Sequence, residues 1–143
     1  MANFMGGNLM AEQNIMVERL VEALNSRDFA AVADMCDEDV AVSGIGEGAD
    51  NGREALRERL ARHFQLFDET YGDALVMTAE GGSPISVRLT ARGRYGGGAP
   101  GLSAAAGQSY SVEKLMLIEL AEGRIARLAL FSDTGELARQ LSK

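Results

Sequence analysis

Two kinds of hydrophobic periodicity divide this chain, and their order constrains the fold more than any other feature. Up to about Asp68, apolar residues recur with helical spacing, interrupted by one short apolar stretch over residues 40–45. From Gly72 to Asp133, apolar and polar residues alternate with the period of β-strands. Helices followed by a meander of strands predict an α+β fold. We expect a cone, in which three N-terminal helices pack on the concave face of a curved, mostly antiparallel sheet.

Three segments of the front half predict helices. The first runs from about residue 9 to residue 25, and we expect residues 1–8 to be a mobile tail because glycines 6 and 7 disfavour helix. Asp28 is placed to cap a short second helix. The third helix is predicted over residues 53–67, with one apolar face. The residues of its opposite face, predicted to be solvent-exposed, are Arg57, Glu58, Arg59 and Arg62.

Four segments of the rear half predict strands, at residues 74–79, 85–95, 110–120 and 124–132. A long loop of small residues, 96–107, separates the second from the third, and a helical turn is predicted over residues 133–141. Residues 115–118 of the third strand are apolar on both faces. A strand that is apolar on both sides predicts that something covers its outer face, and we expect a homodimer through the sheet.

Charge and cysteine content exclude several classes of function. The net charge of −7 argues against a nucleic-acid partner and against an anionic membrane surface, because both need a basic face. A single cysteine, Cys36, cannot form an intrachain disulfide, and one cysteine with one histidine excludes the usual zinc frameworks. The start of the chain has no signal-peptide pattern and no segment is long enough to span a membrane, so we expect a cytoplasmic protein.

Several short motifs, taken in order, resemble the nuclear transport factor 2-like superfamily. They are residues 17–28, the acidic residues 37–39 before a strand, and residues 52–56 at the start of the third helix. Residues 122–125, 131–133 and 136–141 are similar to the C-terminal part of the SnoaL-like polyketide cyclases, and the front half also resembles the steroid delta-isomerases of that superfamily. The resemblance implies a cystatin-like cone that forms a single domain over residues 9–143.

The resemblance implies isomerisation or cyclisation of a small, largely apolar carbonyl or enol compound by proton transfer, which requires neither a cofactor nor a metal. Two positions that steroid isomerases use for catalysis, a tyrosine and a base, fall on Leu20 and Gly44 here, and only a third, acidic position is kept in kind, as Glu113. This predicts that the chain is not a steroid isomerase. A non-catalytic domain that binds a ligand or mediates dimerisation is the alternative.

Glu113 is the first candidate for catalysis. It shares the strand parity of Leu115 and Leu117, so we expect it to face the inside of the cone. There, burial would raise the pKa of its carboxyl group into the range that suits a general acid or base. The alternative is a glutamate at the wet mouth of the cone, paired with Lys114 or with an arginine across the sheet.

Two further residues are candidates for catalysis. His63 lies on the core face of the third helix, where it could shuttle a proton or, alternatively, pack with its ring nitrogens bonded to the backbone. Asp133 is the acid near the chain end that the resemblance to SnoaL-like cyclases would use, but with Glu136 it also fits a capping box. The expected ligand-binding residues are Tyr95, Tyr110, Leu20, Leu60, Phe64, Leu115, Leu128 and Leu130.

Overall fold

Helices come first and strands last, as the periodicity predicts. The computed structural model describes residues 2–46, 48 and 50–142, with side chains from residue 11 onward. The elements are α1 (Ala2–Asn25), α2 (Phe29–Asp34), β1 (Cys36–Ser43), α3 (Arg53–Leu66), β2 (Phe67–Thr78), β3 (Ile85–Tyr95), β4 (Ser109–Ala121), β5 (Arg124–Ser132) and α4 (Thr134–Leu141).

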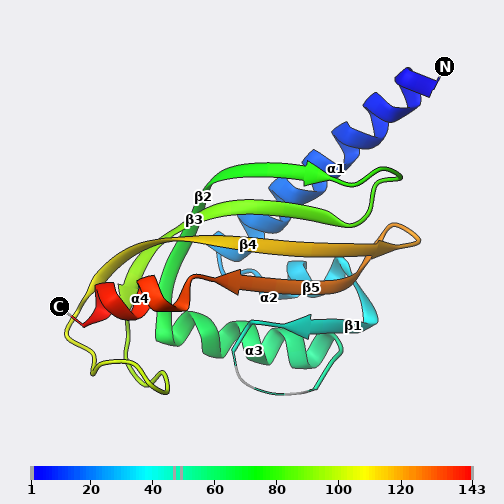
Figure 1. Cartoon of the computed structure of the whole chain (residues 1–143). Coiled ribbons are helices and arrows are strands. Elements are labelled where there is room, and N and C mark those ends of the chain that lie inside the picture. The colour runs from blue at the N-terminus through cyan, green and yellow to red at the C-terminus, as the bar shows by residue number, and fades with distance from the viewer. Residues whose placement is uncertain (1, 47, 49, 143) are drawn as a thin grey trace.

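The strands form one curved sheet in the order β1–β5–β4–β3–β2 (Figure 1). Strands β2 to β5 are antiparallel neighbours, whereas β1 pairs in parallel with β5. The parallel strand is the short apolar stretch that interrupts the helical front of the sequence. The predicted α+β cone with a mostly antiparallel sheet is therefore confirmed.

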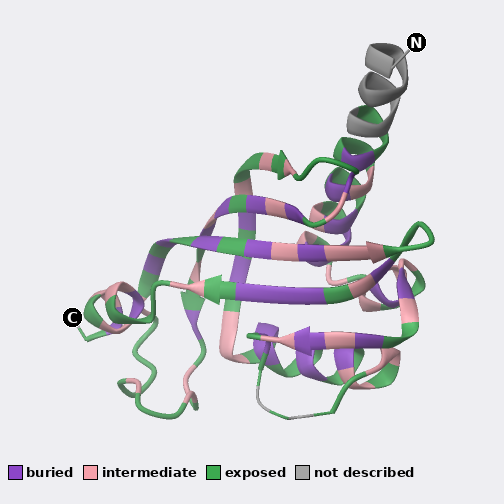
Figure 2. Cartoon of the chain, turned by 45° about the vertical axis from the view of Figure 1, so that its right-hand side comes forward, coloured by how far each residue is buried: buried purple, intermediate pink, exposed green. Residues whose placement is uncertain are grey.

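The core lies between the concave face of the sheet and α1, α2 and α3. Strand β3 shows the alternation most clearly, because Ile85, Val87, Leu89 and Ala91 are all buried while the residues between them are not (Figure 2). From the helical side, α1 contributes a buried face at residues 13, 17, 20 and 24, and α3 contributes the predicted face at residues 56, 60, 63 and 64. None of the helices in the described part of the chain is long and apolar enough to cross a membrane.

Arg59 on α3 is buried, which corrects the prediction that it lies on a solvated face. Its Nε donates to the carbonyl oxygen of Ile45 at 2.8 Å, and its Nη1 donates to those of Val42 and Asp50, each at 3.2 Å. These carbonyl groups lie on both sides of the loop between β1 and α3. The buried guanidinium thus finds backbone acceptors, and it ties α3 to β1 and to the loop between them.

Strand β2 begins at Phe67, earlier than the predicted residue 74. Its pairing with β3 shifts between Gly72 and Leu75, where Asp73 has a φ of 55°. This is a β-bulge, in which extra residues on one strand face a single residue of its neighbour. The pair Gly72–Asp73 has the composition of a turn, so the first half of the strand was wrongly predicted to lie outside the sheet.

The helix α1 begins at Ala2, earlier than the predicted start near residue 9. The side chains of residues 1–10 lie outside the described part of the structure. The mobile tail expected over residues 1–8 is untested and stays a prediction.

Candidate active site

A cluster of polar side chains is buried inside the cone, around the carboxylate of Glu69, which is only 1% exposed. Lys114 Nζ donates to Glu69 Oε2 at 2.7 Å, and the Tyr71 hydroxyl donates to the same oxygen at 2.6 Å. The His63 Nε2 atom lies 3.3 Å from it, and the Tyr110 hydroxyl donates to Oε1. The four partners are themselves buried, so the cluster is a desolvated hydrogen-bond network.

Three elements bring this cluster together. His63 comes from the last turn of α3, and the chain passes from there directly into β2, where Glu69 and Tyr71 alternate onto the inner face. Tyr110 and Lys114 lie on the inner face of β4, in the middle of the sheet. The bulge in β2 follows directly after Tyr71 and so marks the end of the polar part of this strand.

The electrostatics of the cluster fix Glu69 in its ionised form. Burial alone would raise the pKa of its carboxyl group, but the hydrogen bond from His63 and the positive charge of Lys114 together outweigh it and lower the pKa to about 2. Burial and the neighbouring Glu69 charge raise the pKa of Tyr71 and of Tyr110 far above that of a free tyrosine. At neutral pH the cluster therefore holds one carboxylate and two neutral phenols.

The cluster borders a pocket at the mouth of the cone, which we call the mouth pocket. It has a volume of about 440 Å³, within the range of small-molecule sites. The polar side chains of Lys114 and His63 form part of its wall, beside apolar residues of α3, β2, α4 and the 96–107 loop. The residues that line it are Gly44, Gly46, Arg62, His63, Leu66, Phe67, Gly98, Ala99, Pro100, Leu102, Lys114, Ser132, Thr134 and Leu137.

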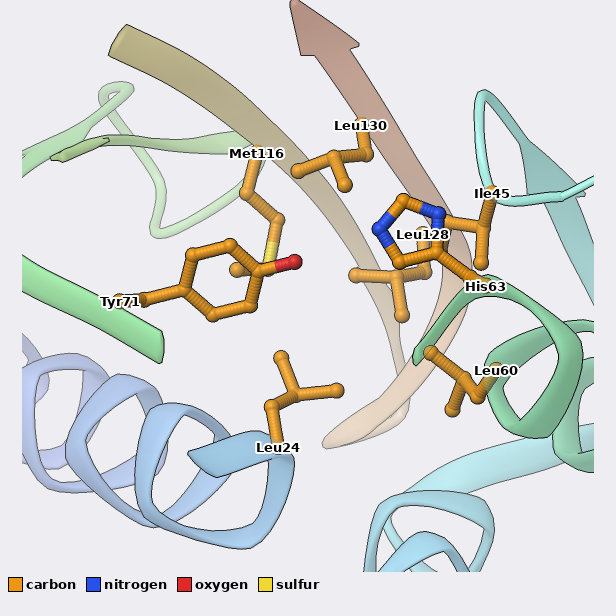
Figure 3. A pocket seen from close by; sticks show the side chains of 8 residues that line it. All are labelled: Leu24, Ile45, Leu60, His63, Tyr71, Met116, Leu128 and Leu130. Carbon is orange, nitrogen blue, oxygen red and sulfur yellow. The ribbon is translucent and has the colours of Figure 1, made fainter. Parts of the chain in front are cut away.

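A second, much smaller cavity lies deeper in the cone. Its volume is about 10 Å³, close to the minimum for a single water molecule. In Figure 3, the Tyr71 hydroxyl points toward the His63 ring, and leucine, isoleucine and methionine side chains surround the two residues. Because His63 also lines the mouth pocket, its ring stands between the two spaces.

The contact with Glu69 determines which nitrogen of His63 can act as a base. A carboxylate accepts hydrogen bonds but cannot donate them, so in the neutral ring it favours the tautomer with the proton on Nε2. The Nδ1 atom then carries the lone pair. Glu69 thereby does for His63 what a buried carboxylate does for the histidine of a catalytic triad, namely hold the ring and set its tautomer.

The prediction that Glu113 faces the inside of the cone was wrong. Its side chain is 73% exposed and lies 3.8 Å from Arg88 Nε on the outer face of the sheet. The register explains the error, because Glu113 pairs with Thr90, whereas the buried Leu89 pairs with Lys114. Directly paired residues share a face, so the even-numbered residues of β4 point inward.

Asp133 and Tyr95 both have structural roles. Asp133 accepts a hydrogen bond from the backbone N–H of Glu136 at 3.0 Å, which is the N-cap of α4 that the sequence offered as the alternative. Tyr95 is buried, and its hydroxyl accepts a hydrogen bond from the backbone N–H of Ala99 at 3.0 Å. Tyr95 therefore holds the 96–107 loop against the cone.

The other expected ligand-binding residues divide into four groups. Leu60, Leu128 and Leu130 line the deep cavity, and Tyr110 binds Glu69. Leu20 and Phe64 are buried in the core but line neither cavity. Leu115 lies on the outer face, which corrects its predicted inward orientation for the same reason as for Glu113.

The chain is similar to a known protein family and to several solved structures. A family model described as SnoaL-like polyketide cyclase matches residues 14–141. A comparison with curated proteins found no match.

Solved structures share the fold at low sequence identity. A candidate polyketide cyclase from Xanthomonas campestris is 24% identical, with a TM-score of 0.83 over 92% of this chain and 97% of that one. A SnoaL-like polyketide cyclase from Agrobacterium tumefaciens is 17% identical, with a TM-score of 0.75 over 90% and 97%. An epoxide hydrolase/cyclase-like enzyme with a role in pyran ring formation in the polyether salinomycin is 18% identical, with a TM-score of 0.71 over 89% and 95%.

Proposed function

Because the chain belongs to the SnoaL-like polyketide cyclase family, we propose that it binds a small, largely apolar carbonyl or enol compound in the mouth pocket and isomerises or cyclises it by proton transfer. His63 is the proposed proton-transfer group and Lys114 the proposed partner of the carbonyl oxygen. One observation carries the proposal: both side chains line the same pocket while both are held by Glu69.

The proposed base is His63 Nδ1, because Nε2 is engaged by Glu69. A histidine is the residue type whose ordinary pKa suits proton transfer near neutral pH. When His63 takes a proton from carbon, the ring becomes positively charged, and the ionised Glu69 stabilises that charge at a distance of 3.3 Å. Glu69 itself, with its pKa of about 2, is too weak a base to take the proton.

Lys114 supports the same reaction at the other end of the carbonyl group. Removing a proton next to a carbonyl group places negative charge on its oxygen, and a fixed ammonium group in a water-poor wall stabilises that charge. Lys114 is 4% exposed and is positioned by its ion pair with Glu69. Leu66, Phe67 and Leu102 supply the apolar surface for the rest of the molecule.

A hydrogen–deuterium exchange assay tests this proposal. Aryl ketones are incubated with the protein in heavy water, and NMR follows the exchange of hydrogen next to the carbonyl group. We expect the wild-type protein to accelerate the exchange, and His63→Gln to lower the catalysed rate roughly 10²–10⁴-fold. The glutamine keeps a donor for Glu69 but has no basic nitrogen. Binding of the ketone should change little, because the pocket keeps its shape.

Arg57→Gln is the matched control, since Arg57 lies on the exposed side of the same helix and outside the mouth pocket. The Arg57→Gln variant should catalyse the hydrogen–deuterium exchange of the ketone at the wild-type rate. An unchanged rate in His63→Gln would contradict the assignment of the base. Binding of ketones without any catalysed exchange by the wild-type protein would favour the alternative, a non-catalytic ligand-binding domain.

We also propose that the chain forms a homodimer through the outer face of the sheet. Leu75, Leu115 and Phe131 are 46%, 36% and 51% exposed, which is high for large apolar residues. They belong to one row across neighbouring strands, in which Arg88 lies between Leu75 and Leu115. An apolar row of this kind supports a second copy of the chain as its cover.

Light scattering after gel filtration tests the dimer. We expect a mass of twice the 15.2 kDa of one chain, and we expect Leu115→Lys to halve it because a charge would be buried in the interface. Ile15→Lys is the control, since Ile15 is 49% exposed but lies on α1 instead of the sheet. A mass of one chain for the wild-type protein would exclude the dimer under those conditions.

A further inference from the structure

The mouth pocket differs in charge from the rest of the molecule. The chain carries a net charge of −7, yet the described residues that line this pocket include Arg62, Lys114 and His63 and no aspartate or glutamate. In the described part of the chain, the one carboxylate in contact with Lys114 or His63 is Glu69, which lies behind the wall and not in it. An acidic protein therefore presents a locally basic surface to whatever enters the cone.

Arg62 is the basic residue of the pocket with no carboxylate partner among the described residues. It is exposed at the end of α3 and forms no ion pair with any residue that the structure describes. Some other exposed arginines of the chain do have partners, such as Arg92 with Asp73 at 2.9 Å and Arg139 with Glu136. A guanidinium group offers a planar fork of N–H donors that matches a carboxylate in two parallel hydrogen bonds.

Lys114 also has unused donors. Its ammonium group carries three N–H bonds, and Glu69 Oε2 is its one hydrogen-bond acceptor among the described residues. Since Lys114 is 4% exposed and lines the pocket, the pocket is the space from which further acceptors can reach it. A bound compound would therefore place an oxygen atom next to Lys114.

From these observations we infer that the substrate of the proposed reaction is a keto acid, whose carboxylate binds Arg62 at the rim of the mouth pocket and whose ketone oxygen faces Lys114. The inference rests on the proposed function for the ketone and on Arg62 for the acid. The negative charge of Glu69 offsets the positive charge of Lys114. The positive charge of Arg62 is therefore left for the bound compound to match. One such charge suits a carboxylate better than a phosphate dianion.

Binding of 3-benzoylpropionate and of its methyl ester, measured by calorimetry, tests this inference. The two compounds share the ketone and the ring and differ in the negative charge. We expect the wild-type protein to bind the acid roughly tenfold or more tightly than the ester, as a charge-assisted hydrogen bond would give. Arg62→Gln should remove that preference by weakening the binding of the acid alone. Arg57→Gln, which removes the same charge from the exposed side of α3, should preserve the preference.

Three results would overturn the inference: equal affinity for acid and ester, equal affinity of the wild-type protein and Arg62→Gln for the acid, or tighter binding of the phosphate analogue 2-oxo-2-phenylethyl phosphate. Deuterium exchange of the same two ketones separates this inference from the proposed function. If the acid is preferred but neither compound exchanges, the carboxylate site stands and the proposed reaction fails. If the ester exchanges as readily as the acid and binds as tightly, the reaction stands and the carboxylate site fails.

Discussion

Replacing Glu69 by glutamine is expected to lower the free energy of unfolding by roughly 3–5 kcal/mol, because it removes one partner of a buried ion pair. Lys114 would keep its charge at 4% exposure with no carboxylate beside it. The hydroxyl groups of Tyr71 and Tyr110 would also donate to a neutral amide in place of an anion, which weakens both hydrogen bonds. Urea denaturation followed by circular dichroism measures the change.

Glu113→Gln is the matched control, since it removes the same charge from a side chain that is 73% exposed beside Arg88. We expect a change within about 0.5 kcal/mol, as is usual for a surface pair. A second variant, Glu69→Gln with Lys114→Met, removes both charges and should be more stable than Glu69→Gln alone. If Glu69→Gln and Glu113→Gln were equally stable, the buried cluster would contribute nothing to folding.

The same carboxylate determines how stability depends on acid. The pKa of Glu69 is about 2 in the folded protein and 4.5 in the absence of its surroundings. A lowered pKa means that the stabilisation is complete above pH 4.5 and is lost as the pH falls toward 2. The difference in stability between the wild-type protein and Glu69→Gln should therefore shrink over that interval.

Gly44→Ala is expected to have an effect of similar size, roughly 4 kcal/mol or more, through the backbone instead of through charge. A Cβ atom at this position would overlap the carbonyl oxygen of Leu130, far inside van der Waals contact distance, and the φ of Gly44 is +75°, where side chains are strained. Any side chain must push β1 away from β5. Gly44 is also the position to which the resemblance to steroid isomerases assigns their base, and Gly44→Asp should unfold the protein for the same reason.

Gly123→Ala separates the two causes. Gly123 has a φ of +78°, almost the same as that of Gly44, but no atom lies within 4 Å of the position that its Cβ would take. The control should lose only the cost of the left-handed backbone, about 1–2 kcal/mol. The difference between the midpoints of thermal unfolding of the two variants then measures the clash with Leu130. Equal losses would mean that β1 moves aside without cost.

The strands β3 and β5 could be predicted from the sequence with their bounds, and the first half of β2 could not. The bounds predicted for residues 85–95 and 124–132 are those of β3 and β5. The family resemblance, on which the cone was also predicted, is confirmed. In β2, however, Gly72 and Asp73 have the composition of a turn although they form a bulge, and this concealed the half of the strand that carries Glu69 and Tyr71.

The candidate site was predicted only in part, for a reason that lies in β4. His63 was expected to face the core and does. In β4, both faces are apolar beyond Lys114, so the hydrophobic pattern alone cannot indicate which side is inside, and the parity of Leu115 and Leu117 wrongly predicts that Glu113 points inward. The sequence did contain one indication of the inner face. Lys114 shares a face of β4 with Val112, Met116 and Ile118, so it either points outward with these apolar residues or is buried with them and paired with an acid. Register with β3 decides between these, and register is a property of the folded sheet.

The bulge in β2 has a consequence for how this site can change by insertion or deletion. Before it, the odd-numbered residues Glu69 and Tyr71 point inward, and after it the even-numbered Val76 and Thr78 are opposite the buried Val87 and Ile85. Deleting one residue within the bulge would restore a regular alternation in which both halves of the strand keep their partners on β3 and their faces. Glu69 and Tyr71 would then stay inside the cone, whereas loss of the single codon between them, that of Thr70, would turn one of the two to the outer surface.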